Sequence, residues 1–268
     1  MNSYLSGFLR EPSNSVSREV LFTHRVSYEL KLGSALSGWD LRVYRPDVDR
    51  DGFDLLVEQM SIARILQLKT VQQQSATRTW KVRARLLHPS RLRSGRLGFS
   101  LPALGLGDGL DGGVVLVDFA LRGESVDVSF RFFDLAVAAA HACALTGRSR
   151  LHAQRAQALM RSVRKAGGRG VVVLRASMFI RVPTAEGLLS LLGMRTRYGG
   201  HWAYNTLRAY AIQFGGEVSP DGVSLSEATQ RSKDALAEVA SGKPAISPAP
   251  PSKLTPRRRQ IADVRKRR

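Results

Sequence analysis

Residues 52–70 read GFDLLVEQMSIARILQLKT, and the fold is organised around this stretch. It contains two runs, Phe53–Glu58 and Ala63–Lys69, each with the length and the branched apolar residues of a β-strand. If the two runs pair as a hairpin that turns at Met60-Ser61, Asp54 faces Gln67 across the pair. Met-Ser is not a favoured two-residue turn, so a longer loop with a shifted register stays open.

Three polar side chains converge in this hairpin. Gln67 and Lys69 share one face of their strand, because side chains alternate along a strand, and Leu68 points to the other face. With Asp54 opposite Gln67, an acid, an amide and an ammonium group meet at one place on a sheet. The alternative is a half-exposed hairpin whose three polar side chains contact only water.

A helix and a strand precede the hairpin. Ser17 is a suitable N-cap for a helix over residues 18–36, which carries the acids Glu19 and Glu29. Both acids also fit an ordinary exposed helix surface. The alternating run Asp40–Arg45 predicts a strand, and a turn-rich connection containing Asp49 leads from it to the hairpin.

Basic residues follow the hairpin. The run Thr79–Leu87 predicts another strand, with Lys81, Arg83 and Arg85 on one face. A stripe of cations suits a phosphate backbone, and it also suits a plain solvent-exposed face. Residues 88–113 are rich in Gly, Pro and Arg and predict a flexible loop, in which Arg91 and Arg93 add positive charge.

The remainder of the chain alternates strands and helices. Strands are predicted at Val114–Leu121, Val126–Phe132, Val171–Leu174 and Met178–Val182, and helices at Asp134–Leu145, Leu151–Lys165, Ala185–Leu192 and Ser226–Val239. Residues 194–216 mix aromatic residues with arginines, which suits either nucleic-acid contact or a packed second layer. We therefore expect an irregular N-terminus at 1–15, a core at 16–113, and 114–240 as its continuation or as a second small α/β domain.

Residues 241–268 differ in composition, because prolines and cations dominate them. Such a segment cannot bury enough apolar surface to fold, and we expect a disordered basic tail. Its cations include Arg257, Arg258 and Arg259, which we expect to contact nucleic acid.

The overall charge indicates a polyanionic partner. The chain has 268 residues with 41 Lys plus Arg against 22 Asp plus Glu, a formal net charge of +19. Nucleic acid is the usual partner of such a chain, and an anionic membrane surface is a less common one. Cys143 is the single cysteine, which excludes an internal disulfide and fits a reducing compartment. The chain lacks a signal-peptide pattern and a long apolar run, so a soluble cytoplasmic protein is expected.

The order of helix with glutamate, strand, Asp54 and then Gln67-Leu68-Lys69 resembles the PD-(D/E)XK nuclease superfamily in its Q-x-K variant, over roughly residues 18–87. The restriction-endonuclease-like and Holliday-junction-resolvase-like members are the most similar in pattern. The resemblance implies an α/β (α+β) fold: a restriction-endonuclease-like core with a central mixed sheet flanked by helices, followed by a C-terminal α/β extension and the basic tail.

The resemblance also implies a set of roles. Asp54, Gln67, Lys69 and Glu19 would be catalytic, and the metal would be Mg²⁺ or Mn²⁺. Asp54, the Gln67 amide oxygen and the Leu68 backbone carbonyl would ligate it, together with Glu19 or Glu29, and Asp49 is an alternative to Asp54. Lys69 would orient the attacking water or stabilise charge on the phosphate.

The function implied is Mg²⁺-dependent endonucleolytic hydrolysis of DNA, with RNA as an alternative substrate and a homodimer as one assembly. Gln67 stands where the superfamily commonly has an acid, so a catalytically inactive nucleic-acid-binding protein on the same scaffold stays open. A third reading is an unrelated α/β protein whose basic tail docks on RNA or a membrane.

Overall fold

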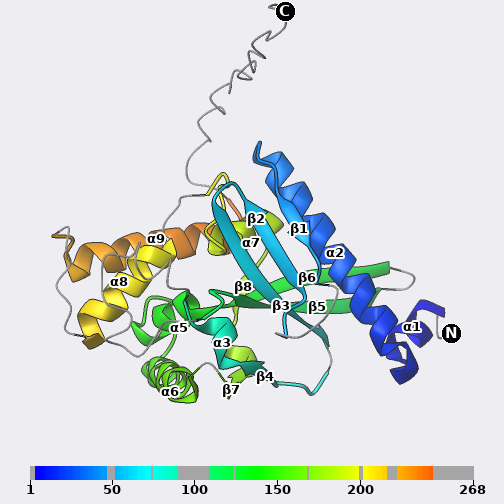
Figure 1. Cartoon of the computed structure of the whole chain (residues 1–268), viewed down its shortest axis with the longest axis horizontal. Helices are drawn as coiled ribbons and strands as arrows, with labels where there is room; N and C mark the ends of the chain where they lie inside the picture. The colour runs from blue at the N-terminus through cyan, green and yellow to red at the C-terminus, as the bar shows by residue number, and fades with distance from the viewer. Residues whose placement is uncertain are drawn as a thin grey trace, which may run out of the picture.

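A computed structural model describes residues 4–46, 52–73, 75–89, 109–122, 125–167, 169–198, 202–215 and 222–243 of the chain. Its centre is one mixed sheet of six strands in the order β1-β2-β3-β5-β6-β8 (Figure 1). The strands are β1 (Arg42–Tyr44), β2 (Leu55–Gln59), β3 (Ile62–Gln72), β5 (Gly113–Arg122), β6 (Ser125–Phe133) and β8 (Ile180–Val182). β3 and β5 run parallel, and the other neighbours are antiparallel. The predicted α/β fold class is confirmed.

The parallel pair joins early and late parts of the chain. Leu66 of β3 pairs with Gly113 of β5, and the ladder continues to Gln72 and Phe119. β5 and β6 cover the strands predicted at Val114–Leu121 and Val126–Phe132, and they pair as a hairpin with Arg122 opposite Ser125. β5, β6 and β8 therefore lie in the same sheet as the β2–β3 hairpin.

A second, two-stranded sheet pairs β4 (Thr79–Arg83) with β7 (Val171–Arg175). The prediction of one strand over Thr79–Leu87 is wrong in its second half, where Ala84–Leu87 form the short helix α3. The ladder ends there because β7 starts at Val171, and the Ala84 N–H donates instead to the Gly170 carbonyl (2.9 Å). The sequence Ala-Arg-Leu-Leu has high helix propensity, and its Leu86 and Leu87 are buried.

The N-terminus is helical, which corrects the prediction of an irregular segment over residues 1–15. α1 (Tyr4–Arg10) and a 3-10 turn (Pro12–Asn14) precede α2 (Ser15–Leu36), so α2 starts before the predicted cap at Ser17. Buried Leu9 fixes α1, and its carbonyl accepts a hydrogen bond from Arg18 Nη1 (2.6 Å).

α2 covers one face of the sheet. Its Phe22 stacks on Phe119 of β5 with ring centroids 4.8 Å apart. The same face holds α7 (Ala185–Leu191), which packs against Gly33, where an added Cβ would lie 3.1 Å from the Ala185 Cβ. The helix continues through Gly33, and the missing side chain lets α7 approach α2 closely at this point.

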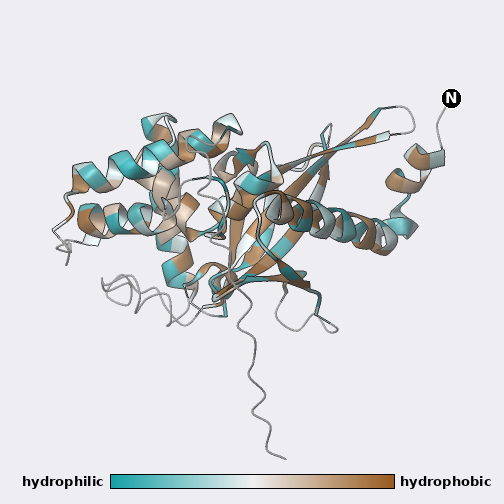
Figure 2. Ribbon diagram, turned by 90° about the horizontal axis from the view of Figure 1, so that it is seen from above, coloured by the Kyte–Doolittle hydropathy of each residue, from teal (hydrophilic) through white to brown (hydrophobic). Residues whose placement is uncertain are grey.

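The opposite face holds the two-stranded sheet. Trp80 of β4 packs edge-on against Phe179 (centroids 5.6 Å apart), and Phe179 contacts Phe133 of β6. Seen from above, the central strands are largely apolar, while the helices have one apolar and one polar side (Figure 2). The core therefore lies on both faces of the central strands.

The remaining helices gather beyond β6 and β8. They are α5 (Leu135–Ala142), α6 (Arg150–Ala166), α8 (Trp202–Gly215) and α9 (Leu225–Ser241), with a 3-10 turn at Ala176–Met178. α5 is buried along its whole length, and Asp134 caps it by accepting from the Val137 N–H (2.8 Å). Of the two readings for residues 194–216, the packed layer is the observed one, because Trp202 and Arg208 of α8 are buried.

Candidate functional site

The β2–β3 hairpin has the register that brings Asp54 and Gln67 together. Leu55 pairs with Leu66 and Gln59 with Ile62, so Met60 and Ser61 form the two-residue turn. Met60 takes a positive φ of 55°, the conformation that this tight turn requires. At the other end, the ladder stops with Leu55 opposite Leu66, and the Asp54 N–H also donates to the Leu66 carbonyl (2.8 Å), so Asp54 lies just beyond the ladder, beside the stretch of β3 that contains Gln67.

Asp54 is held against the backbone of β3. Its Oδ2 accepts a hydrogen bond from the Leu68 N–H at 2.5 Å. A residue in a strand directs its N–H and its C=O to the same neighbouring strand, so the Leu68 carbonyl is also on the Asp54 side. The carboxylate and the Leu68 carbonyl thus lie at the same place, where β2 begins.

Gln67 carries an unsatisfied polar atom. Its Oε1 is buried and finds no hydrogen-bond donor within the described ranges. Burying a carbonyl oxygen without a partner costs about 1–3 kcal/mol, so such an atom calls for an explanation. An amide oxygen is a suitable ligand for a hard cation, and one at this position would satisfy it.

Two further residues border Gln67. A Cβ placed on Gly52 would lie 3.8 Å from Gln67 Nε2 and 3.6 Å from both Cδ and Nε of Arg83. Gly52 has a φ of +73°, which glycine adopts without strain. The Arg83 side chain therefore reaches from β4 to the end of the hairpin where Asp54 and Gln67 lie.

Lys69 lies two residues beyond Gln67 on the same face of β3, and its side chain is half-buried. Further along this face, a cavity of about 240 Å³ is lined by Val71, Leu116, Trp80 and Asp118. Asp118 pairs with Arg131 through Nε–Oδ2 (2.6 Å) and Nη2–Oδ1 (3.1 Å) contacts. Burial raises the Asp118 pKa, and the Arg131 guanidinium opposes that rise.

The structure does not bring the two helix glutamates to Asp54. Phe119 pairs with Gln72, so Phe22 and the whole of α2 pack on the face of β3 opposite to Gln67 and Lys69. Glu19 is exposed there, and Glu29 pairs with Arg25 (2.8 Å). The expected role of Glu19 or Glu29 as a ligand beside Asp54 is not supported by this packing and stays a prediction.

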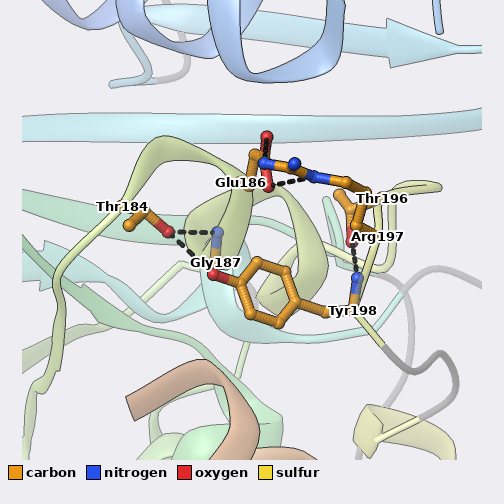
Figure 3. A network of polar contacts seen from close by, with 6 residues as sticks. All are labelled: Thr184, Glu186, Gly187, Thr196, Arg197 and Tyr198. Carbon is orange, nitrogen blue, oxygen red and sulfur yellow. Dashed lines mark hydrogen bonds and ion pairs between the residues drawn. The ribbon is translucent and has the colours of Figure 1, made fainter. Parts of the chain in front are cut away.

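Glu29 instead borders a different cavity, of about 340 Å³, between α2 and α7. Figure 3 shows the polar network on its wall, where Arg197 points at Glu186 and the Tyr198 hydroxyl lies beside Thr184. Arg197 Nε donates to Glu186 Oε2 (3.0 Å), and Thr184 Oγ1 caps α7 by accepting from the Gly187 N–H (3.1 Å). The network ties residues 196–198 to the start of α7, which is a structural role.

Of the predicted nucleic-acid contacts, Lys81 and Arg83 are exposed on β4 and Arg85 is exposed on α3. Trp80 and Val82 of β4 point inward, so the predicted alternation of β4 is confirmed. Five of the predicted residues lie outside the described residues: Arg91, Arg93, Arg257, Arg258 and Arg259. The alternative ligand Asp49 lies outside them too.

The donors at the hairpin suit a hydrated Mg²⁺ rather than a protein cage. No cluster of three or more His, Cys, Asp or Glu side chains suited to a metal occurs in the ranges listed above. One carboxylate, one amide oxygen and one backbone carbonyl remain, namely those of Asp54, Gln67 and Leu68. Mg²⁺ commonly keeps several waters and takes only one or two carboxylates, so this small set fits it.

Neither Cys143 nor His141 offers an alternative reactive centre. Burial raises the pKa of the Cys143 thiol to about 12, so the thiol stays protonated. His141 donates from Nε2 to the Met178 carbonyl (2.9 Å) and accepts at Nδ1 from the Thr146 hydroxyl (2.8 Å). Burial first, and His152 second, lower the His141 pKa to about 4, so it is a neutral structural group.

The Asp118–Arg131 pair was not part of the expected site, and Arg83 was expected to contact a phosphate backbone rather than to border Gln67. An acid inside the apolar run of residues 114–121 is a signal for a buried, paired carboxylate. The contact of Arg83 with the hairpin has no such signal, because it depends on how the two sheets pack.

None of the helices in the described ranges is both long and apolar enough to cross a bilayer. In comparisons with known proteins, no family model matches the chain, and no curated protein or solved structure matches it significantly.

Proposed function

We propose that the chain is a Mg²⁺-dependent endonuclease that hydrolyses phosphodiester bonds of DNA at the β2–β3 hairpin. The observation that carries the proposal is the buried, unsatisfied Oε1 of Gln67 near Asp54, with Lys69 on the same face of β3 as Gln67. The order of elements supports a restriction-endonuclease-like core. The helix α2 is followed by the antiparallel strands β1, β2 and β3, and β5, which comes after β4 and α3 in the chain, pairs in parallel with β3.

Each residue of the hairpin has one proposed task. The Asp54 carboxylate, the Gln67 amide oxygen and the Leu68 carbonyl hold the cation, and the Leu68 N–H keeps the carboxylate in place. When bound, Mg²⁺ polarises a phosphoryl oxygen and lowers the pKa of a coordinated water. Lys69 donates hydrogen bonds toward the attacked phosphate and stabilises the negative charge that develops there. Lys81, Arg83 and Arg85 bind flanking phosphates.

A second candidate function is nucleic-acid binding without cleavage on the same scaffold. The observation that favours it is the packing of α2, which carries Glu19 and Glu29, on the face of β3 opposite to Gln67, with Asp54 as the described carboxylate at the start of β2. With a single negative charge, the site would bind Mg²⁺ weakly. This candidate predicts DNA affinity that does not change when divalent cations are removed.

Cleavage of supercoiled plasmid in Mg²⁺ and in EDTA tests the proposal. Wild-type protein is expected to nick the plasmid in Mg²⁺ alone, and Lys69→Ala to lower the rate at least about 100-fold. Lys31→Ala is the matched control, because Lys31 is an exposed cation on α2 on the other face of the sheet. Absence of nicking by wild-type protein that still binds the plasmid would leave the second candidate, and equal nicking by Lys69→Ala would reject both assigned roles of Lys69.

A further inference from the structure

Two long segments of the chain contain no acidic residue. No Asp or Glu occurs between Glu58 and Asp108, or between Asp134 and Glu186. Every charge that these two segments carry is therefore positive. The first includes β4 and α3, and the second includes α6 and β7.

The fold brings the two acid-free segments together. β4 and β7 pair along their whole length, with Lys81 opposite Val173 and Arg83 opposite Val171. Beyond the last pair, the Ala84 N–H donates to the Gly170 carbonyl (2.9 Å), and α3 contacts α6. In Figure 1 these four elements lie side by side below the main sheet.

The outward side of this unit is basic. β4 and β7 bury alternate residues, so Lys81, Arg83 and Arg175 share the exposed face. The last turn of α6 and the connection to β7 add Arg164, Lys165 and Arg169, all exposed, next to Arg85 at the start of α3. We call these seven residues the basic ridge: Lys81, Arg83, Arg85, Arg164, Lys165, Arg169 and Arg175.

Cations elsewhere in the molecule are often neutralised by acids. Arg25 pairs with Glu29, Arg122 with Asp127, and Arg231 with Glu227. Across the described ranges, no acid pairs with Lys81, Lys165, Arg169 or Arg175 of the ridge. A surface that gathers like charges without counter-charges destabilises the fold unless a polyanion binds to it.

The ridge ends at the candidate site. Arg83 is its member nearest to the hairpin, because the Arg83 side chain borders Gly52 and Gln67. A duplex bound along β4, β7 and the end of α6 would therefore lead one of its strands to Asp54 and Lys69. Lys and Arg contacts with phosphates position a duplex without reading its sequence.

We propose that the basic ridge is a sequence-independent docking surface for the phosphate backbone of duplex DNA, separate from the hydrolytic site and continuous with it through Arg83. The choice of DNA over other polyanions rests on the proposed function. The ridge sets affinity and its salt dependence, whereas Asp54, Gln67 and Lys69 set the metal-dependent chemistry.

Duplex binding in EDTA isolates the ridge from catalysis. The triple variant Lys81→Gln, Lys165→Gln, Arg169→Gln removes three ridge charges and leaves Arg83 in place. The matched control Lys31→Gln, Arg42→Gln, Lys233→Gln removes three exposed charges that lie elsewhere, on α2, β1 and α9. Fluorescence anisotropy of a labelled duplex of mixed sequence is measured for the full-length proteins between 50 and 200 mM KCl.

Each phosphate contact adds about 0.9 to the slope of log K against log salt. The slope of the ridge variant is expected to be smaller in magnitude by about 2.7 than that of wild type. Between 50 and 200 mM KCl, the association constant of the variant should therefore fall by a factor that is roughly forty times smaller than the factor for wild type. The control is expected to keep the wild-type slope. The docking role of the ridge would be overturned by equal slopes for the ridge variant and wild type. It would also be overturned if the ridge variant and the control variant lost the same amount of slope.

The two proposals fail separately. A ridge variant that binds as wild type does, in a protein that still nicks plasmid in Mg²⁺, rejects the ridge and leaves the nuclease. Loss of slope in the ridge variant, in a protein that never nicks plasmid, rejects the nuclease and leaves the ridge.

Discussion

Asp54 has two tasks, and they can be separated by substitution. Its carboxylate accepts the Leu68 N–H at 2.5 Å, which is a structural contact, and the same carboxylate is the proposed charged ligand. Hydrogen bonds to charged groups contribute about 1.5–3 kcal/mol, and the half-buried position places this one toward the lower end.

The Asp54→Ala variant is therefore expected to lose about 1.5 kcal/mol of unfolding free energy in urea titrations. Asp54→Asn keeps an oxygen acceptor for the Leu68 N–H and should lose about half as much, although it removes the charge. If both variants unfold at the same urea concentration as wild type, the contact with Leu68 does not stabilise the hairpin.

The sequence predicts the β2–β3 register because register and alternation are local properties of a hairpin, although the Asp54 N–H bonds to the Leu66 carbonyl beyond the last pair. Met60 supplies the positive φ that the unfavourable Met-Ser turn needs, so no longer loop forms. The place of Glu19 is not predictable in this way. The face of the sheet that a helix covers is decided by contacts between distant residues, such as Phe22 with Phe119. Such contacts cannot be predicted from the local sequence pattern.

At the level of single elements, β5 is constrained by its first residue. A Cβ on Gly113 would lie 2.5 Å and 2.8 Å from ring atoms of Phe132, which is fully buried and cannot move aside. Gly113→Ala is expected to cost about 1–3 kcal/mol through overpacking. Gly7→Ala is the control, because Gly7 lies in α1 with open space around it and should gain about 0.5–1 kcal/mol. Thermal unfolding followed by circular dichroism measures both, and equal midpoints for Gly113→Ala and wild type would contradict the packing.

The packing of α5 against α6 predicts acid sensitivity. The ring centroids of His141 on α5 and His152 on α6 lie 4.5 Å apart. Burial lowers the His141 pKa to about 4. In the unfolded chain its pKa is about 6.5, so the unfolded state binds the proton first as the pH falls. The stabilisation is complete above pH 6.5 and is lost toward pH 4.

About 3 kcal/mol of unfolding free energy should be lost between pH 6.5 and pH 4 through His141. Urea titrations across this range measure the loss, and His141→Gln should flatten the profile. His24→Gln is the control, because His24 is exposed and its Nε2 lies 2.9 Å from Arg45 Nη1 at the surface. A flat wild-type profile from pH 6.5 to pH 4 would show that His141 is protonated in the folded protein.

Elements with strong periodicity were predictable and their ends were not. The alternation of Lys81, Val82 and Arg83 predicts β4. The same alternation continues in the sequence through Arg85, although α3 has already begun at Ala84. The end of β4 depends on the start of β7, which lies about ninety residues further along the chain. Non-local pairing of this kind decides element ends in most sheets.

At the scale of the whole molecule, the parallel β3–β5 ladder makes one folding unit of the sheet. If the chain were divided into a core at 16–113 and a separate domain at 114–240, β3 would lose its neighbour β5, and both strands would become exposed sheet edges. We expect a single cooperative unfolding transition. Tryptophan fluorescence from Trp39, Trp80 and Trp202 and far-UV circular dichroism should give coincident urea curves, and two separated transitions would contradict a single unit.

The central claim is that Asp54 and Gln67 together form a cation site at the end of the hairpin where β2 begins. Titration of Mn²⁺ followed by the electron paramagnetic resonance signal of the free ion measures this directly, without DNA and without turnover. Gln67→Leu removes the unsatisfied oxygen and should leave the metal-free protein as stable as wild type, or slightly more so.

Wild-type protein is expected to take up one Mn²⁺ ion per chain, with affinity reduced roughly tenfold or more in both Asp54→Asn and Gln67→Leu. Glu19→Gln and Glu29→Gln, on the opposite face of the sheet, should bind Mn²⁺ as wild type does. A wild-type protein that binds no Mn²⁺, or a Gln67→Leu protein that binds it unchanged, would contradict the account.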